Sequence, residues 1–141
     1  MQYNIYQIPS QTPLETPLTG KNKRNILIVL ENSAYQSQSD LLRRIMQSVG
    51  LDLETDCLVL PLLEPDYIPF HKLQKKYKIS DVLVFGEFMK HLGIQARIPA
   101  NSPFTFSGAK FLRTYPLPQL ISDQAKKRKL WNALKQMFPT S

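Results

Sequence analysis

The sequence predicts an α/β fold in which strands and helices alternate along the chain. Short runs of branched apolar residues, such as residues 25–30 (Asn-Ile-Leu-Ile-Val-Leu), are typical of strands that are buried on both faces. Between these runs, apolar residues recur every three or four positions, which is the spacing of amphipathic helices. Strands separated by helices pair in parallel, so we expect a three-layer α/β/α sandwich with a four-stranded, mainly parallel sheet.

Eight segments carry this pattern. The expected strands are residues 25–30, 56–63, 80–85 and 111–115. The expected helices are residues 40–49, 69–78, 86–92 and 123–138. In the last helix, Leu130, Trp131 and Leu134 are expected to pack on the sheet. Ligands of such folds bind beyond the carboxyl ends of the strands, so the candidate site residues are sought there.

The first 24 residues differ in composition from the rest of the chain. They contain Pro9, Pro13 and Pro17 among Gln, Thr and Ser residues, which predicts an extended tail ahead of one domain at residues 25–141. The tail nevertheless carries large apolar side chains that a disordered spacer would lack. We expect them either to pack on the domain or to bind a partner protein, and they are Tyr3, Ile5, Tyr6 and Ile8.

The charge is unevenly distributed. Residues 110–141 carry seven Lys and Arg residues against Asp123 alone, whereas residues 25–109 carry eight against nine Asp and Glu residues. A basic end on a nearly neutral body suggests an acidic partner, either nucleic acid, bound weakly, or an acidic protein segment. The expected contact residues are Lys110, Arg113, Lys126, Lys127 and Lys129.

Several classes of protein are disfavoured by the composition. The single cysteine, Cys57, cannot form an internal disulfide and lies in an apolar run, so we expect a packed, inert thiol. No apolar run is long enough for a membrane span, and the first residues do not resemble a signal peptide. These features predict a soluble cytoplasmic protein that does not associate with membranes and uses no metal or cofactor.

The order of motifs in the last third of the chain resembles the uracil-DNA glycosylase superfamily. The run at residues 82–86 (Val-Leu-Val-Phe-Gly) is similar to a strand of that family that ends in Gly, and residues 126–137 are similar to its last helix, which carries a Trp. Between them, residues 114–118 (Thr-Tyr-Pro-Leu-Pro) correspond to a His-Pro turn that supplies a catalytic His. Tyr115 stands at the His position, so the resemblance implies the fold but not the usual chemistry.

Other positions of the family's site also differ. Glu31 fits a Gly-Glu-Ala-Pro-Gly motif after the first strand, but both glycines are absent, and so are the aromatic that stacks on the base and the cysteines of the iron–sulfur branch. We therefore expect a degenerate pocket and no enzymatic activity. The alternative is a residual glycosylase, or another nucleic-acid-binding enzyme, that uses this pocket. Its expected residues are Glu31, Asn32, Ser33, Gly86, Tyr115 and Pro116.

The layout is also similar to the psi-subunit family of bacterial DNA polymerase III, which resembles a glycosylase fold without its chemistry. Both have an N-terminal peptide, a domain of similar length and a last helix with a Trp, here in Lys129-Leu130-Trp131. The resemblance implies a non-catalytic adaptor of DNA replication or repair. Its partners would be the clamp loader or a complex of single-stranded-DNA-binding protein.

Overall fold

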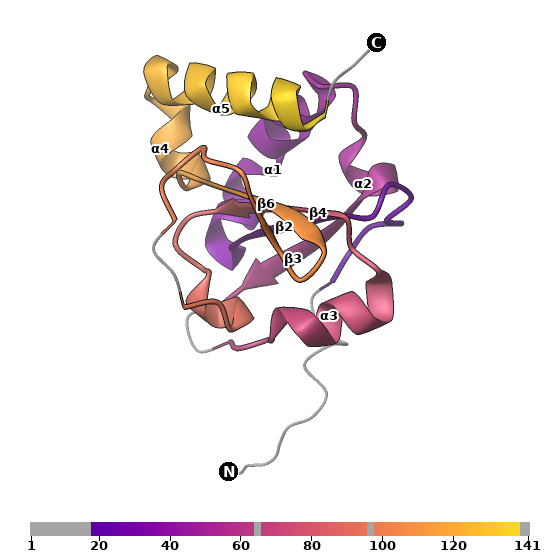
Figure 1. The fold of residues 1–141 in the computed structure, drawn as a ribbon. Helices are drawn as coiled ribbons and strands as arrows, with labels where there is room; N and C mark the ends of the chain where they lie inside the picture. The colour runs from indigo at the N-terminus through magenta and orange to yellow at the C-terminus, as the bar shows by residue number, and fades with distance from the viewer. Residues whose placement is uncertain (1–17, 64–65, 96–97, 139–141) are drawn as a thin grey trace.

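A computed structural model describes residues 18–63, 66–95 and 98–138, which fold around a five-stranded sheet (Figure 1). The strands lie in the order β3-β2-β4-β6-β5. Adjacent strands from β3 to β6 pair in parallel, and β5 pairs antiparallel with β6. Their bounds are β2 Ile26–Glu31, β3 Cys57–Leu62, β4 Asp81–Phe85, β5 Phe104–Phe106 and β6 Ala109–Thr114.

The side chains of each strand alternate between the two faces of the sheet, and both sets are largely apolar. Helices therefore cover both faces. On one face, apolar residues of the strands pack against helices α1, α4 and α5. On the other face they pack against α3 and the short 3₁₀ helix η2. The bounds are α1 Asn32–Gln47, α2 Leu53–Asp56, α3 Phe70–Tyr77, η2 Lys90–Leu92, α4 Leu117–Ile121 and α5 Gln124–Met137.

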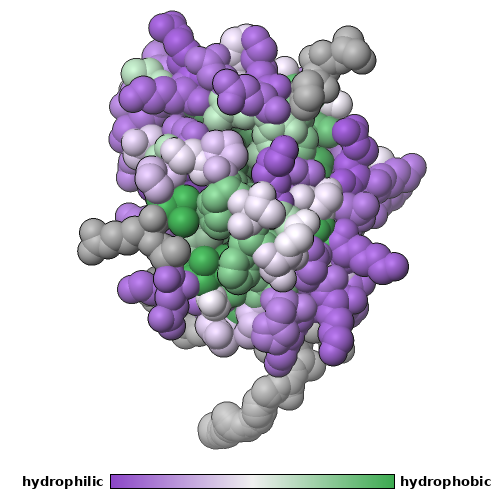
Figure 2. All heavy atoms as spheres, in the orientation of Figure 1, coloured by the Kyte–Doolittle hydropathy of each residue, from purple (hydrophilic) through white to green (hydrophobic). Residues whose placement is uncertain are grey.

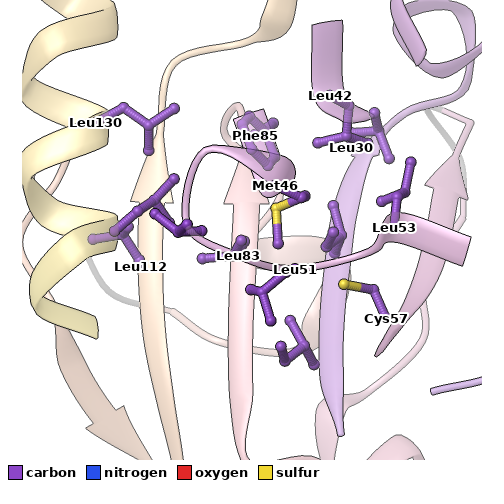
Figure 3. Close-up of a cluster of buried hydrophobic side chains, with 14 of the residues drawn as sticks. Leu30, Leu42, Met46, Leu51, Leu53, Cys57, Leu83, Phe85, Leu112 and Leu130 are labelled. Atoms are coloured by element: carbon purple, nitrogen blue, oxygen red, sulfur yellow. The ribbon is translucent and has the colours of Figure 1, made fainter. Parts of the chain in front are cut away.

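The larger core lies between the sheet and helices α1 and α5 (Figure 3). Leu30 and Leu112 extend from strands toward Leu42 and Met46 of α1 and Leu130 of α5, and each of these side chains is at most 2% exposed. Cys57 begins β3 on the same face and is fully buried, as the sequence predicts. Burial of this apolar surface fixes the helices on the sheet.

The sheet has five strands, not the predicted four. The additional strand, β5, forms a hairpin with β6 in which Phe106 pairs with Ala109 across a two-residue turn. Both turn residues have positive φ, 53° at Ser107 and 81° at Gly108, as a type I′ turn requires. Ser-Gly flanked by alternating apolar residues is a hairpin signal that the sequence analysis did not use.

The helices also depart from their predicted bounds. Helix α1 begins at Asn32, directly after β2, and its backbone is interrupted at Gln38, where φ is −128°. The helix predicted at residues 86–92 is only the three-residue η2. The short helices α2 and α4 were not predicted, because four or five residues are too few for a helical period to be recognised.

Residues 18–24, which the sequence analysis assigns to the tail, make hydrogen bonds with the domain. Thr19 and Val59 of β3 exchange two backbone bonds of 3.1 and 2.8 Å. The backbone N–H of Arg24 donates to the carbonyl of Asp56. This segment therefore pairs with part of the exposed edge of β3. The four apolar residues predicted to bind a partner, Tyr3, Ile5, Tyr6 and Ile8, lie outside the described residues.

The predicted packing of Trp131 on the sheet is wrong, although Leu130 and Leu134 pack there as expected. Trp131 is 42% exposed, whereas Leu130 and Leu134 are at most 2% exposed. The buried face of α5 consists of Leu130, Ala133, Leu134 and Met137, at spacings of three and four residues. Because each helical residue is turned by about 100° from the last, Trp131 falls on the flank of that face.

Candidate functional site

The predicted pocket residues gather at the carboxyl edge of the sheet. Strands β2, β4 and β6 are parallel neighbours, with Leu30 opposite Phe85 and Phe85 opposite Thr114. The residues that follow these strands therefore lie along one edge. The chain passes from β2 to β3 on one side and then to β4 on the other, so a topological switch point lies between the ends of β2 and β4. Ligands of open α/β sheets bind at such a point.

At the end of β2, no loop separates the strand from the following helix. Glu31 is exposed and is the N-cap residue of α1, but its side chain does not cap the helix. Asn32 and Ser33 form the first turn, and the hydroxyl of Ser37 donates to the carbonyl of Ser33 at 2.8 Å. Two of the predicted pocket residues are therefore part of a helix rather than of a loop that could close over a ligand.

Side chains pack closely around Gly86, which follows β4. The N–H of Gly86 donates to the carbonyl of Thr114 at 2.9 Å, and its φ is +123°. A Cβ atom at Gly86 would lie 2.8 Å from Cε2 of Phe88 and 3.7 Å from Cγ of Pro116. The absence of a side chain at Gly86 leaves room for the ring of Phe88 and the side chain of Pro116, which lie close to the end of β4.

Tyr115 follows β6 at the position where the resemblance places a catalytic His. Its half-buried ring packs against the core. The Nζ atom of Lys126 lies 4.3 Å from the centre of the ring. The same nitrogen donates to Oε1 of Gln119 at 3.0 Å and lies 4.0 Å from Oδ2 of Asp123. Tyr115 is thus held within a polar cluster at the start of α5.

The chemistry available at this edge is limited. Glu31 supplies a carboxylate and Tyr115 a phenol, and the ring of His91 packs edge-on against Phe88 of the loop after β4, with ring centroids 5.3 Å apart. His71 is exposed on α3, and Nδ1 of His91 lies 2.6 Å from the backbone carbonyl of Asp66. Across the described residues, no group of three His, Cys, Asp or Glu side chains is placed to hold a metal ion.

The predicted basic surface does not form a single patch. Arg113 lies on the face of the sheet opposite α5, since it alternates with Leu112 along β6, and its Nε donates to the carbonyl of Ile98 at 2.7 Å. Lys110 lies on the α5 face and lines a cavity of about 330 Å³ with Gln136 and Met137. On α5, Lys126 and Lys127 are half-buried and Lys129 is exposed. Hydrophilic residues gather over α5 at the top of the view in Figure 2.

A groove between α1 and α5 contains residues that the sequence analysis missed. Its volume is about 340 Å³. The sequence analysis placed Leu130 and Trp131 in the core and named Lys127 as a contact residue, but it assigned no role to Arg44. A second helical stripe lies beside the buried face of α5 and consists of Gln124, Lys127, Arg128 and Trp131. This spacing of three and four residues could have identified the groove. The groove is lined by Arg44, Ile45, Ser48, Gln124, Lys127, Arg128, Leu130 and Trp131.

Comparison with known proteins finds no protein-family model and no curated protein that matches the chain. The fold and the site therefore rest on this chain's own residues. In residues 18–63, 66–95 and 98–138, no helix combines the length and the apolar character needed to cross a membrane.

Proposed function

We propose that this protein is a non-catalytic adaptor of the DNA replication or repair machinery, similar in role to a psi subunit. The proposal rests on the packing of Phe88 and Pro116 around Gly86 at the carboxyl edge of the sheet. A glycosylase must hold an extruded base in a pocket and donate a proton or hydrogen bond to it as it leaves. Side chains packed against Gly86, together with Tyr115 in place of His, suit that chemistry poorly.

The proposed fold is a glycosylase-like three-layer sandwich. Four parallel strands in the order β3-β2-β4-β6 and helices packed on both faces support this proposal. The proposed partners are the clamp loader or a complex of single-stranded-DNA-binding protein, and the support for them is the similarity of layout together with the basic α5. Binding at α5 would use charge, so it should weaken as salt is raised.

The adaptor proposal can be tested with purified proteins. The full chain is mixed with a bacterial clamp-loader complex or with single-stranded-DNA-binding protein, and association is measured by sedimentation velocity. We expect a stable complex with at least one of them, and weaker binding by the variant Lys126→Glu/Lys127→Glu. The control is Lys75→Glu/Lys76→Glu, an equal charge change on the exposed side of α3. Failure to bind either partner would remove the adaptor proposal.

The alternative, a residual glycosylase, has its own assay. A duplex that contains uracil is incubated with the protein and treated with alkali, which cleaves the strand wherever a base has been removed. We expect no cleavage above background. Cleavage that disappears in Glu31→Gln would instead support an enzyme whose site lies at the carboxyl edge of the sheet and uses Glu31, Asn32 and Tyr115.

A further inference from the structure

The groove between α1 and α5 combines an apolar floor with a basic rim. Ile45 and Leu130 contribute apolar surface, and Trp131 adds an indole ring at its side. Helix α4 packs against both α1 and α5, and the groove opens between these two helices. In Figure 1, α5 lies above α1 at the top of the sheet.

Trp131 is both exposed and held in position. Its exposed fraction of 42% is high for a large aromatic side chain. The Nζ atom of Lys135, one turn further along α5, lies 4.1 Å from the ring centre. A cation over the ring restricts its rotation, so little side-chain entropy would be lost on binding a ligand. A partly exposed Trp beside a hollow is a typical anchor point of a protein interface.

The rim of the groove is positively charged. Arg44, Lys127 and Arg128 line it, and none of the lining residues carries a carboxylate. Of the acidic residues close to these cations along the chain, Asp40 is paired with Arg43 at an N–O distance of 2.7 Å, and Asp123 caps α5 by accepting a hydrogen bond from the N–H of Lys126. Within the described part of the chain, no ion pair uses the three cations of the rim. Their field would attract a ligand that carries negative charge.

We propose that this groove binds an acidic linear peptide of a partner protein, with a bulky apolar side chain of the peptide seated against Ile45, Leu130 and Trp131. This inference rests on the proposed adaptor function and identifies the chemistry of one partner. Carboxylates on either side of the apolar anchor would meet Arg44, Lys127 and Arg128. Two Arg residues suit this role because a guanidinium can bind a carboxylate through two parallel hydrogen bonds.

A single-stranded nucleic acid fits the groove less well. Proteins that bind such strands stack successive bases on several aromatic side chains along a charged track. Here one aromatic lines the groove, and Lys135 already occupies one side of its ring. The apolar floor of Ile45 and Leu130 matches an aliphatic or aromatic side chain better than it matches phosphates.

The only Trp of the chain provides a direct readout. The full protein is titrated with a synthetic peptide that has Leu-Phe at its centre and acidic residues on both sides, and Trp131 fluorescence is recorded. We expect a saturable change and at least tenfold weaker binding in Arg44→Glu/Arg128→Glu. The matched control, Lys75→Glu/Lys76→Glu on α3, should bind like the unmodified protein. Circular dichroism establishes that each variant is folded.

Three further probes decide between the possible ligands. They are the same peptide with Asn and Gln for its acidic residues, the same peptide with Ser-Ser for Leu-Phe, and an oligothymidine. We expect each to bind at least tenfold more weakly than the acidic peptide. Oligothymidine binding that exceeds peptide binding, or peptide binding that survives Arg44→Glu/Arg128→Glu, would overturn the inference. If the clamp loader or the single-stranded-DNA-binding protein still binds while the peptide does not, the adaptor function stands and only the groove assignment fails.

Discussion

The side-chain nitrogen of Lys126 lies 4.3 Å from the centre of the Tyr115 ring, and this contact joins the start of α5 to the end of β6. A cation over a tyrosine ring at a partly exposed position contributes about 0.5–1 kcal/mol. Tyr115 is therefore part of the packing between a basic helix and the sheet edge. At the same position, the resemblance to glycosylases would require a His that faces a substrate.

Gly86 should tolerate substitution poorly. In Gly86→Ala, the backbone would have to keep a φ of +123°, which residues with a side chain rarely adopt. The new Cβ would also lie only 2.8 Å from the Phe88 ring. We expect a loss of about 2–4 kcal/mol in the free energy of unfolding, measured by urea denaturation. Gly108→Ala is the control, because its φ is +81° but its nearest neighbour is 4.0 Å away. Strain alone should cost about 1–2 kcal/mol there.

A double-variant cycle isolates the contact with Phe88. The cost of Gly86→Ala should be smaller in a Phe88→Ala background, because the ring that opposes the new methyl group is gone. An equal cost in both backgrounds would mean that the stability lost in Gly86→Ala comes from backbone strain and not from the contact with Phe88.

Asp123 should stabilise α5 as its N-cap. Its Oδ1 accepts a hydrogen bond from the N–H of Lys126 at 3.1 Å. We expect Asp123→Ala to lower the free energy of unfolding by about 1 kcal/mol. Asp123→Asn is the control, since an amide oxygen can accept the same bond without the charge. If Asn is as harmful as Ala, the charge of Asp123 and not its cap accounts for the loss.

Cys57 should make the protein less stable in alkali. Burial raises the pKa of its thiol from an ordinary value of 9.0 to about 12, and the nearby carboxylate of Asp56 adds to the effect. The folded protein keeps the thiol protonated at pH 10, whereas the unfolded chain releases the proton. The contribution of the protonated thiol to stability is fully present well below pH 9 and falls by about 1.4 kcal/mol by pH 10.

The measurement is the free energy of unfolding between pH 8 and pH 10, with Cys57→Ala for comparison. Tyrosine and lysine titrations are shared by both proteins, so the difference between the two profiles reports the thiol. Parallel profiles would mean that Cys57 ionises equally in the folded and unfolded states.

Leu134 and Trp131, about one turn apart on α5, should differ in how much their loss destabilises the protein. Leu134 is fully buried, and Leu134→Ala should cost about 2–5 kcal/mol. Trp131 is 42% exposed, so Trp131→Ala should cost about 1–2 kcal/mol. Melting temperatures of the two variants provide the comparison. A greater loss for Trp131→Ala would show that the indole is a core residue, as the sequence analysis assumed, and not a groove residue.

The amino-acid sequence by itself determined the elements with strong periodicity. The strands β2, β3, β4 and β6, and the helices α3 and α5, lie within a few residues of their predicted bounds. Each is long enough for its apolar pattern to show, and the buried strands carry continuous branched runs. The inert character of Cys57 also followed from its apolar neighbours, because burial disfavours the charged thiolate.

Only the tertiary structure decided which side chains meet. Lys110 and Arg113 lie near one another in the chain yet on opposite faces of the sheet, because side chains of a strand alternate. The groove joins Arg44 of α1 to Trp131 of α5, and their proximity depends on how both helices cross the sheet. The approach of Phe88 and Pro116 to Gly86 likewise depends on the parallel register of β4 and β6. Local sequence sets the period of each element, but the packing between elements sets which surfaces remain open.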